Sequence, residues 1–293
     1  MRRYDIVFIG HPTTAIVVPF EGPTVIEQGC LAFYTAMAAS CLPKKLALVT
    51  KMPMDEEHIL APLKTAGIDI YLRPGAGSRV RVMHPKPNVD ERKMILEQPP
   101  GHFCIEDLPP LEPCLIHLGG FGDQEFPMEF LQSLKERGFR LSADIQSFIW
   151  QVDDQTHFIQ PKDISHKQEI LRMVDFMKFD VFEAKVLTGT DDIHEQAAML
   201  EKLGSAETLI TSANGALACY KGESHFCKFT NKNILGRTGR GDTFCGAYLV
   251  RRLDHSLEDS LKFAVALTSI KMESPGPFKG TLEDVSERMR QEM

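Results

Sequence analysis

The sequence lacks several features that would each place a 293-residue chain in a definite class. Its seven cysteines form no C-x-x-C pair, and their odd number and irregular spacing argue against a disulfide framework and against a zinc site. Its ten histidines show no H-x-x-x-H or other metal-binding spacing. The cysteines are therefore expected to be buried thiols in a reducing compartment.

Long hydrophobic runs and an excess of basic residues are also absent. The longest mostly apolar stretch, residues 30–42, is too short to span a bilayer and suits a buried helix. No signal peptide is apparent, because the short apolar run near the N-terminus is typical of a strand. The net charge of −7 disfavours nucleic acid as a partner. These absences predict a cytoplasmic protein that binds neither membranes nor nucleic acids.

Strand-like runs alternate with helical patterns along the chain. Helices are expected at 54–67, 126–138 and 192–204, and a glycine closes each of them. Apolar runs typical of strands lie at 4–10, 45–50, 114–120, 140–145 and 207–212. This alternation predicts an α/β fold in one domain, residues 1–293, with a central mostly parallel sheet and helices on both faces.

Two stretches interrupt that alternation with short strands broken by proline and glycine. They are residues 13–29 and a region of about 70–97, which we expect to form a small β-strand lid beside the main sheet. Arg79 and Arg81 alternate along the second stretch and could either meet a charged substrate or face solvent. An edge strand of such a lid could pair with a second copy, which leaves a homodimer as an alternative to a monomer.

Residues 235–253, LGRTGRGDTFCGAYLVRRL, concentrate glycine and arginine at the start of a predicted helix. Gly239 and Gly241 can turn their N–H groups outward, and the first turn of the helix adds its own free N–H groups. Such a helix start binds anions, and phosphate is the usual one. The motif is not a Walker A loop, because no Lys-Ser/Thr follows, and Phe244 stands where a dinucleotide fingerprint has its third glycine.

The carboxylate of Asp242 lies inside this predicted anion site. A carboxylate would repel phosphate there unless it had chemistry to perform, and a general base that takes a proton from an attacking hydroxyl performs such chemistry. The alternative is that Asp242 only caps the helix. The two glycines and Arg240 beside it favour the catalytic interpretation, and Arg240 could stabilise charge during phosphoryl transfer.

The stretch GRTGRGDTFCGAYL resembles the C-terminal signature of the ribokinase-like (PfkB) sugar kinase family, typically D-T-x-G-A-G-D. The resemblance implies that Asp242 is the catalytic base and that Gly239, Arg240 and Gly241 form the anion hole for the transferred phosphoryl group. It also places Thr238 at the nucleotide. Further matches extend the resemblance over roughly residues 4–280, so it implies a ribokinase-like fold for the whole chain.

Two of these further matches concern the nucleotide and its metal. LITSANGALACYKG resembles the family's T-x-G-x-x-G hairpin, which implies that Thr211 and Gly215 lie near the nucleotide. FDVFEAKVLTG resembles the N-x-x-E motif, with Asp180 in place of Asn and with Glu183 retained. The family motif organises magnesium and its waters, so the resemblance implies ATP and Mg²⁺ as cofactors.

The sequence departs from the family at the cation and substrate positions. Gly236 replaces the first Asp of the signature, which helps to hold a monovalent cation in many members, and this leaves potassium activation open. Ala15 replaces an Asp that grips substrate hydroxyls. The early G-G-x-x-x-N stretch keeps Gly29 but has Tyr34 in place of the Asn.

Candidate substrate contacts are therefore Gly29 and Tyr34, together with two residues at predicted strand ends, His11 and Asp144. The resemblance implies transfer of the γ-phosphoryl group of ATP to a hydroxyl of a small sugar or polyol. A nucleoside or an inositol is an alternative acceptor on the same fold. A nucleotide- or sugar-sensing protein without turnover is a further alternative, although the retained Asp242 argues against it.

Overall fold

The computed structural model describes residues 1–29, 31–86 and 93–291. Within these ranges a sheet has the strand order β15-β14-β13-β12-β9-β8-β1-β4-β5. The strands from β13 to β5 are parallel to their neighbours, and β14 and β15 extend the sheet as an antiparallel hairpin. The strands are β1 (Ile6–Ile9), β4 (Leu46–Met52), β5 (Asp69–Pro74), β8 (Leu115–Leu118), β9 (Arg140–Asp144), β12 (Phe176–Asp180), β13 (Glu207–Thr211), β14 (Gly215–Tyr220) and β15 (Glu223–Lys228).

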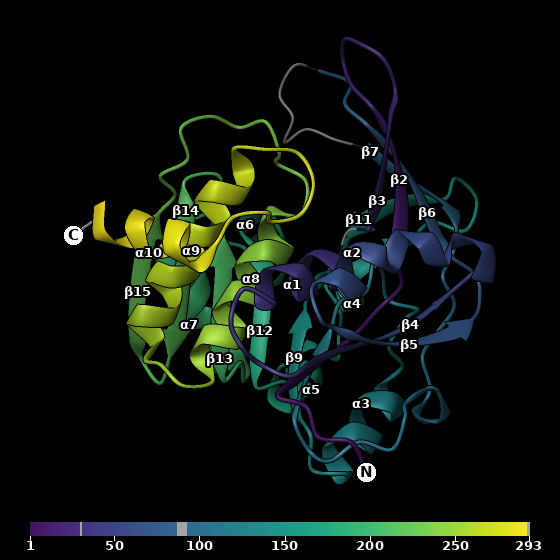
Figure 1. The fold of residues 1–293 in the computed structure, drawn as a ribbon, viewed down its shortest axis with the longest axis horizontal. Coiled ribbons are helices and arrows are strands. Elements are labelled where there is room, and N and C mark those ends of the chain that lie inside the picture. Colours follow the sequence, from purple (N-terminus) through teal and green to yellow (C-terminus); the bar gives the residue numbers. More distant parts are fainter. Residues whose placement is uncertain (30, 87–92, 292–293) are drawn as a thin grey trace.

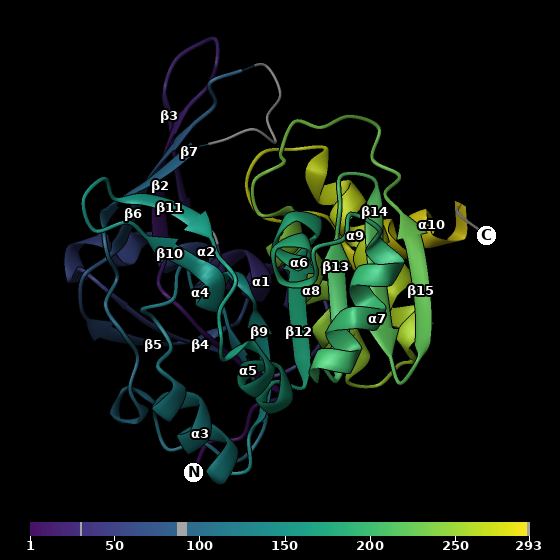
Figure 2. The same ribbon diagram turned by 180° about the vertical axis from the view of Figure 1, so that it is seen from behind.

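Helices cover both faces of this sheet, as the alternating sequence pattern predicts (Figures 1 and 2). Apolar side chains from one face pack against α1 (Ala32–Ala39), α2 (Ala61–Thr65), α8 (Arg240–Arg252), α9 (Leu257–Met272) and α10 (Leu282–Gln291). The other face packs against α3 (Met128–Glu136), α5 (Lys167–Met173), α6 (Val181–Thr188) and α7 (Ile193–Leu203). The expected α/β architecture is confirmed.

The glycines that close the predicted helices behave as their position requires. Gly204 is the C-cap of α7 with a φ of 117°, and Gly138 follows α3 with a φ of 82°. The helix predicted at 54–67 is split into a 3₁₀ helix, Met54–Leu60, and the short α2. Pro62 lies in the first turn of α2, where its missing N–H group leaves no hydrogen bond unmade.

A second sheet rises beside the first and has the strand order β10-β11-β7-β6-β2-β3 (Figure 1). Its strands come from three separate parts of the chain. They are β2 (Thr13–Val18), β3 (Val25–Gly29), β6 (Ser78–Met83), β7 (Lys93–Gln98), β10 (Trp150–Val152) and β11 (Phe158–Pro161). The short α4 (Gln146–Ile149) leads directly from β9 of the main sheet into β10.

The expected lid boundaries need two corrections. Residues 69–74 form β5, which pairs in parallel with β4 at the edge of the main sheet. This part of the second sheet therefore begins only at Ser78. An edge strand with one exposed face has the same mixed pattern as a lid strand, which explains the error. The hairpin β10–β11 was missed because strands of three and four residues carry little pattern. Residues 87–92 of the expected lid lie outside the described residues.

The parallel strands bring several polar residues to one edge of the main sheet. Asp144, Asp180 and Thr211 are the last residues of β9, β12 and β13, and these three strands are neighbours with the same direction. Ligands of α/β sheets bind at the carboxyl ends of the strands. This edge is therefore where a site is expected. No helix in the described part of the chain is both long and apolar enough to cross a membrane.

Candidate active site

A cavity of about 440 Å³ lies between the second sheet and the carboxyl edge of the main sheet. On one side it is lined by side chains of β2, β6 and β7, and on the other by the ends of β12 and β13 and by residues 234–242. The predicted residues that line it are Asp180, Glu183, Thr211, Thr238, Gly239, Arg240, Gly241 and Asp242. The structure thus brings together residues that are more than 60 positions apart in the sequence.

The glycine-rich turn runs into helix α8 in the way the sequence suggested. Gly239 is the N-cap of α8 with a φ of 77°, a conformation that favours glycine, and the ring of Tyr34 leaves no room for a Cβ there. No side chain caps this helix. Asp242 instead lies within the first turn of α8 and lines the cavity. The alternative that Asp242 serves as the helix cap is therefore wrong.

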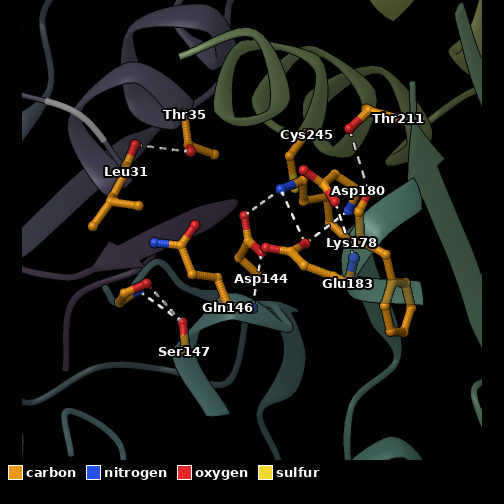
Figure 3. A network of polar contacts seen from close by, with 12 residues as sticks. Leu31, Thr35, Asp144, Gln146, Ser147, Lys178, Asp180, Glu183, Thr211 and Cys245 are labelled. Carbon is orange, nitrogen blue, oxygen red and sulfur yellow. Dashed lines mark hydrogen bonds and ion pairs between the residues drawn. The ribbon is translucent and has the colours of Figure 1, made fainter. Parts of the chain in front are cut away.

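A buried lysine lies directly beneath this turn, and sequence reasoning missed it. The ammonium of Lys178, on β12, is 2.7 Å from Oδ2 of Asp144 and 3.9 Å from Oε2 of Glu183 (Figure 3). A Cβ on Gly241 would lie 3.0 Å from the same nitrogen. The sequence carried a signal for it, because Lys178 interrupts the apolar run Phe176–Phe179 of the strand FMKFD. A lysine that is 5% exposed requires partners of this kind.

The charged side chains in this cluster shift one another's pKa values. Burial alone would lower the pKa of Lys178, but Asp144 and Glu183 raise it above its usual value, so the side chain stays an ammonium. The pKa of Asp242 is raised to about 6, because burial and the nearby Asp144 raise it more than Lys178 and Lys271 lower it. A carboxylate with a pKa near 6 is suited to accept a proton close to neutral pH.

Asp180 and Glu183 form a reciprocal capping box at the start of α6. Oδ1 of Asp180 accepts from the N–H groups of Phe182 and Glu183, and Oε2 of Glu183 accepts from the N–H group of Asp180 at 2.7 Å. Oε1 of Glu183 accepts from the indole of Trp150. Burial raises the pKa of Glu183, and Lys178 opposes this shift. Both oxygens of Glu183 are thus engaged by protein donors.

The two predicted residues of the β13–β14 hairpin differ in their placement. Thr211 lines the cavity, and its hydroxyl donates to the carbonyl of Phe179. Gly215 does not line the cavity. A Cβ at Gly215 would collide with the carbonyl of Cys227 on β15. Glycine is therefore needed at this position for packing within the hairpin.

None of the four predicted substrate contacts lines the cavity. His11 donates from Nδ1 to Oε2 of Glu125 at 2.8 Å and packs against Phe103, and both His11 and Glu125 are buried. Gly29 has a φ of 111° and packs on a neighbouring ring of α1. Tyr34 lies beneath Gly239, and Asp144 lies behind Lys178.

Other side chains line the part of the cavity where those four residues were expected. On the second-sheet side the lining is mainly apolar, with Thr13, Glu27, His84 and Gln146 as its polar members and Ala15, Val17, Leu31, Val80, Val82, Met94 and Phe121 as its apolar ones. Val80 and Val82 face the cavity. Arg81 therefore points the other way and pairs with Glu97 at 2.7 Å, which supports the solvent-facing alternative for the two arginines.

Comparison with known proteins decides the family. A family model for the pfkB family of carbohydrate kinases matches residues 116–283. The chain belongs to this family. It is therefore a ribokinase-like carbohydrate kinase, an enzyme that phosphorylates a hydroxyl group.

Individual relatives of this pfkB kinase are similar over most of its length. The cytidine kinase of Thermococcus kodakarensis is 25% identical over 255 residues, which are 84% of this chain and 87% of the relative. A pyrophosphate-dependent kinase of the ribokinase family, solved as a sulfate complex, is 29% identical with a TM-score of 0.88 and coverage of 96% and 99%. Ribokinase of Arabidopsis thaliana, solved with ribose and ATP, has 17% identity, a TM-score of 0.72 and 99% coverage of both chains, which shows the shared fold.

Proposed function

We propose that this pfkB kinase transfers the terminal phosphoryl group of ATP, with Mg²⁺, to a hydroxyl of a small uncharged polyol. The observation that carries the proposal is the position of Asp242. Its carboxylate, with a pKa of about 6, lines the same cavity as the glycine-rich turn and the Lys178 ammonium. A base and a set of phosphate-binding groups in one cavity are the parts that phosphoryl transfer requires.

Asp242 acts on the acceptor in this proposal. The acceptor oxygen attacks the terminal phosphorus of the donor, the bond from that phosphorus to the bridging oxygen breaks, and the hydroxyl proton passes to the Asp242 carboxylate. Burial keeps the basicity of Asp242 above that of an exposed aspartate, which favours this transfer near neutral pH. The position of Asp242 in the first turn of α8 places it beside the N–H groups of that turn.

The charge of the transferred group is balanced by groups on the same wall of the cavity as Asp242. The N–H groups of Gly239 and Gly241 are at the N-terminal end of α8, where helix amides without internal partners bind anions. The N–H group of Arg240 donates to the carbonyl of Arg237 at 3.1 Å, so the contribution of Arg240 to this site is its side chain. The Lys178 ammonium lies beneath the turn, and the side chains of Arg237 and Arg240 line the cavity. Preorganised donors of this kind are a large source of catalysis in phosphoryl transfer.

Asp180 fits a role in holding Mg²⁺ better than Glu183 does. Asp180 lines the cavity with one oxygen committed to helix amides, whereas Glu183 has both oxygens bound by protein donors. Mg²⁺ in such sites keeps several waters and binds mainly substrate phosphates, whose charge it neutralises. Asp180 would hold the ion through its carboxylate or a water, and Glu183 would fix Asp180 in place.

Pyrophosphate is a second candidate donor. Two solved structures of pyrophosphate-dependent ribokinase-family enzymes are 29% and 28% identical to this chain, with TM-scores of 0.88 and 0.87. Three cationic side chains, Lys178, Arg237 and Arg240, line one side of the cavity. Because pyrophosphate carries no base or ribose, it must be bound through its phosphate oxygens, and such a cluster supplies positive charge for them.

The other wall suits a cyclic polyol as the acceptor. The hydroxyl of Thr13 and one oxygen of Glu27 are buried without a hydrogen-bond partner among the described residues, and both side chains line the cavity. Polar groups in this state recognise hydroxyls, while the apolar lining packs against C–H faces. The solved relative with a pyrophosphate analogue also holds myo-inositol, so we propose an inositol as the first acceptor to test.

A donor-by-acceptor screen tests this proposal. The enzyme is assayed with Mg²⁺ and either ATP or pyrophosphate against inositols, aldoses and nucleosides, with release of ADP or phosphate as the readout. We expect turnover with an inositol that exceeds turnover with ribose or cytidine. Turnover only with cytidine would overturn the acceptor and support a nucleoside kinase. Tight donor binding without turnover on any acceptor would support the sensing alternative.

Two further proposals concern assembly and compartment. Strand β3 is an edge of the second sheet and exposes Val25 and Ile26, so we propose that two copies pair through it. The described cysteines form no disulfide, which fits a reducing cytoplasm. Light scattering of the wild type and of an Ile26→Lys variant tests the pairing, because the charge on the edge is expected to give monomers.

A further inference from the structure

The end of helix α9 places a buried ammonium against the back of the glycine-rich turn. Lys271 lies in the last turn of α9 and is 1% exposed. Its Nζ atom donates to the main-chain carbonyl of Gly236 at 2.6 Å and to that of Thr238. Nζ also lies 5.3 Å from the centre of the Tyr34 ring, which is within the range of a cation–π interaction.

Other contacts fix the same segment to α9. The N–H groups of Leu235 and Gly236 both donate to the carbonyl of Met272, and Gly236 packs so closely on Ser274 that a Cβ would collide with its carbonyl. The ring of Tyr34 fills the space between Lys271 and Gly239, where it leaves no room for a Cβ. The back of the turn is therefore held by Lys271, Tyr34 and the end of α9, while its front lines the cavity.

A cation bound by main-chain carbonyls in a turn is the chemistry by which proteins hold potassium. In many members of the pfkB family an exchangeable monovalent cation is held with the help of the first Asp of the signature, where this chain has Gly236. Here the carboxylate is absent, and two carbonyl oxygens at this point of the turn are occupied by the Lys271 ammonium. These residues do not fit an exchangeable monovalent cation.

We propose that Lys271 is a positioning residue that supplies, from within the chain, the cation that orders the glycine-rich turn. The inference rests on the proposed kinase function, because the role of Lys271 is to aim the N–H groups of Gly239 and Gly241 at the transferred phosphoryl group. Binding of the ammonium to the carbonyls also polarises the peptide groups of the turn, which strengthens their N–H groups as donors. The enzyme then works at the same rate in potassium, sodium or a large organic cation.

The test compares the wild type with Lys271→Met and Lys271→Ala in buffers of KCl, NaCl, NH₄Cl or tetramethylammonium chloride. Lys262→Met is the matched control, because Lys262 lies on the same helix but is exposed and pairs with Glu258. We expect less than a twofold dependence on the cation for the wild type and the control. We expect kcat to fall at least 30-fold in Lys271→Met, with the acceptor KM within about threefold.

Chemical rescue distinguishes a positioning role from a merely structural one. We expect ammonium or potassium to raise the kcat of Lys271→Ala at least fivefold over tetramethylammonium, because the vacated carbonyls can bind a small cation. Activation of the wild type more than fivefold by potassium would overturn the proposal, and so would a Lys271→Ala variant with unchanged kcat.

A readout without turnover separates this inference from the proposed function. The melting temperature of Lys271→Ala is expected to rise by several degrees in ammonium or potassium over tetramethylammonium, while that of the wild type does not change. If the wild type shows no kinase activity but this pattern holds, the proposed function fails and the built-in cation stands. A wild-type melting temperature that rises selectively with potassium would refute the built-in cation even if the kinase activity is found.

Discussion

The two walls of the cavity are built on different principles. The wall formed by β12, β13 and residues 234–242 carries main-chain amides, Lys178 and two arginines. The wall formed by β2, β6 and β7 is mainly apolar, with a few polar side chains such as Thr13 and Glu27. The first wall can stabilise charge on phosphorus whatever the acceptor is. The second has little charge to offer and can only select by shape and by hydroxyl pairing. Chemistry and selectivity are thus separated in space.

This separation predicts that the largest loss of rate comes from Asp242 on the charged wall. Asp242→Asn removes the proposed base and is expected to lower kcat by about 10³-fold, within the range of general-base catalysis, with an acceptor KM close to that of the wild type. Steady-state kinetics with the best donor and acceptor measure this. A loss of less than tenfold would mean that another group takes the proton.

The stability of the same variant shows whether a loss of activity comes from misfolding. The folded-state pKa of Asp242 is above its unfolded value, so the ionised carboxylate destabilises the fold above about pH 6 and has no such effect below about pH 4. Asp242→Asn should therefore be more stable at pH 8 by about 1–2 kcal/mol, after allowance for its partial exposure to the cavity. Urea unfolding at pH 8 and pH 4 tests both the size and the sign.

Removal of the buried Lys178 ammonium is expected to have the next largest effect on kcat. Lys178→Met is expected to lower kcat by about 10²-fold and to raise the donor KM, because it deletes one preorganised positive group at the phosphate. The single change leaves Asp144 buried without its counter-charge. The double variant Asp144→Asn/Lys178→Met removes that imbalance. If the double variant recovers wild-type kcat, Lys178 serves the fold and not the donor.

A change of pH is expected to alter the rate less than these substitutions on the charged wall do. Because the proposed base acts in its ionised form and Asp242 has a pKa of about 6, kcat/KM is expected to fall by about tenfold between pH 7.5 and pH 5. The profile should be flat from pH 7 to pH 8.5, where Lys178 remains an ammonium. A profile without an acidic limb would exclude Asp242 as the titrating base.

A substitution on the apolar wall should have the smallest effect, and it should change the acceptor KM and not kcat. Thr13→Val removes a hydroxyl that lines the cavity, so the acceptor KM is expected to rise about three- to tenfold, while the donor KM is unchanged. Thr14→Val is the matched control, since Thr14 lies on the opposite side of the same strand. Equal effects of the two variants on acceptor KM would contradict the assignment of this wall to the acceptor.

The glycine-rich part of the charged wall could be predicted from the sequence, because it is continuous in the chain and uses the backbone. Residues 236–246 contain the glycines, the helix start and the proposed base in one stretch. Lys178 was missed because its partner Asp144 is 34 positions away, and only the pairing of β9 with β12 brings them together.

The apolar wall could not be predicted in the same way. Its residues come from strands of a second sheet, and which of them face the cavity depends on register. A shift of one residue would exchange Val80 for Arg81. Tyr34 was expected to contact substrate because of its place in a motif, but it packs beneath the turn, since glycine at position 239 leaves space for a ring. Side-chain packing of this kind leaves no periodic trace in a sequence.

The close contact between Gly236 and Ser274 has an evolutionary consequence. An aspartate at position 236, as in the family signature, cannot be introduced by a single substitution, because its Cβ would collide with the carbonyl of Ser274. The segment after α9 would have to move first, and Lys271 would have to be lost or turned away at about the same time. Glycine at 236 and lysine at 271 are therefore expected to occur together in related chains, and an aspartate at 236 is expected where the lysine is absent.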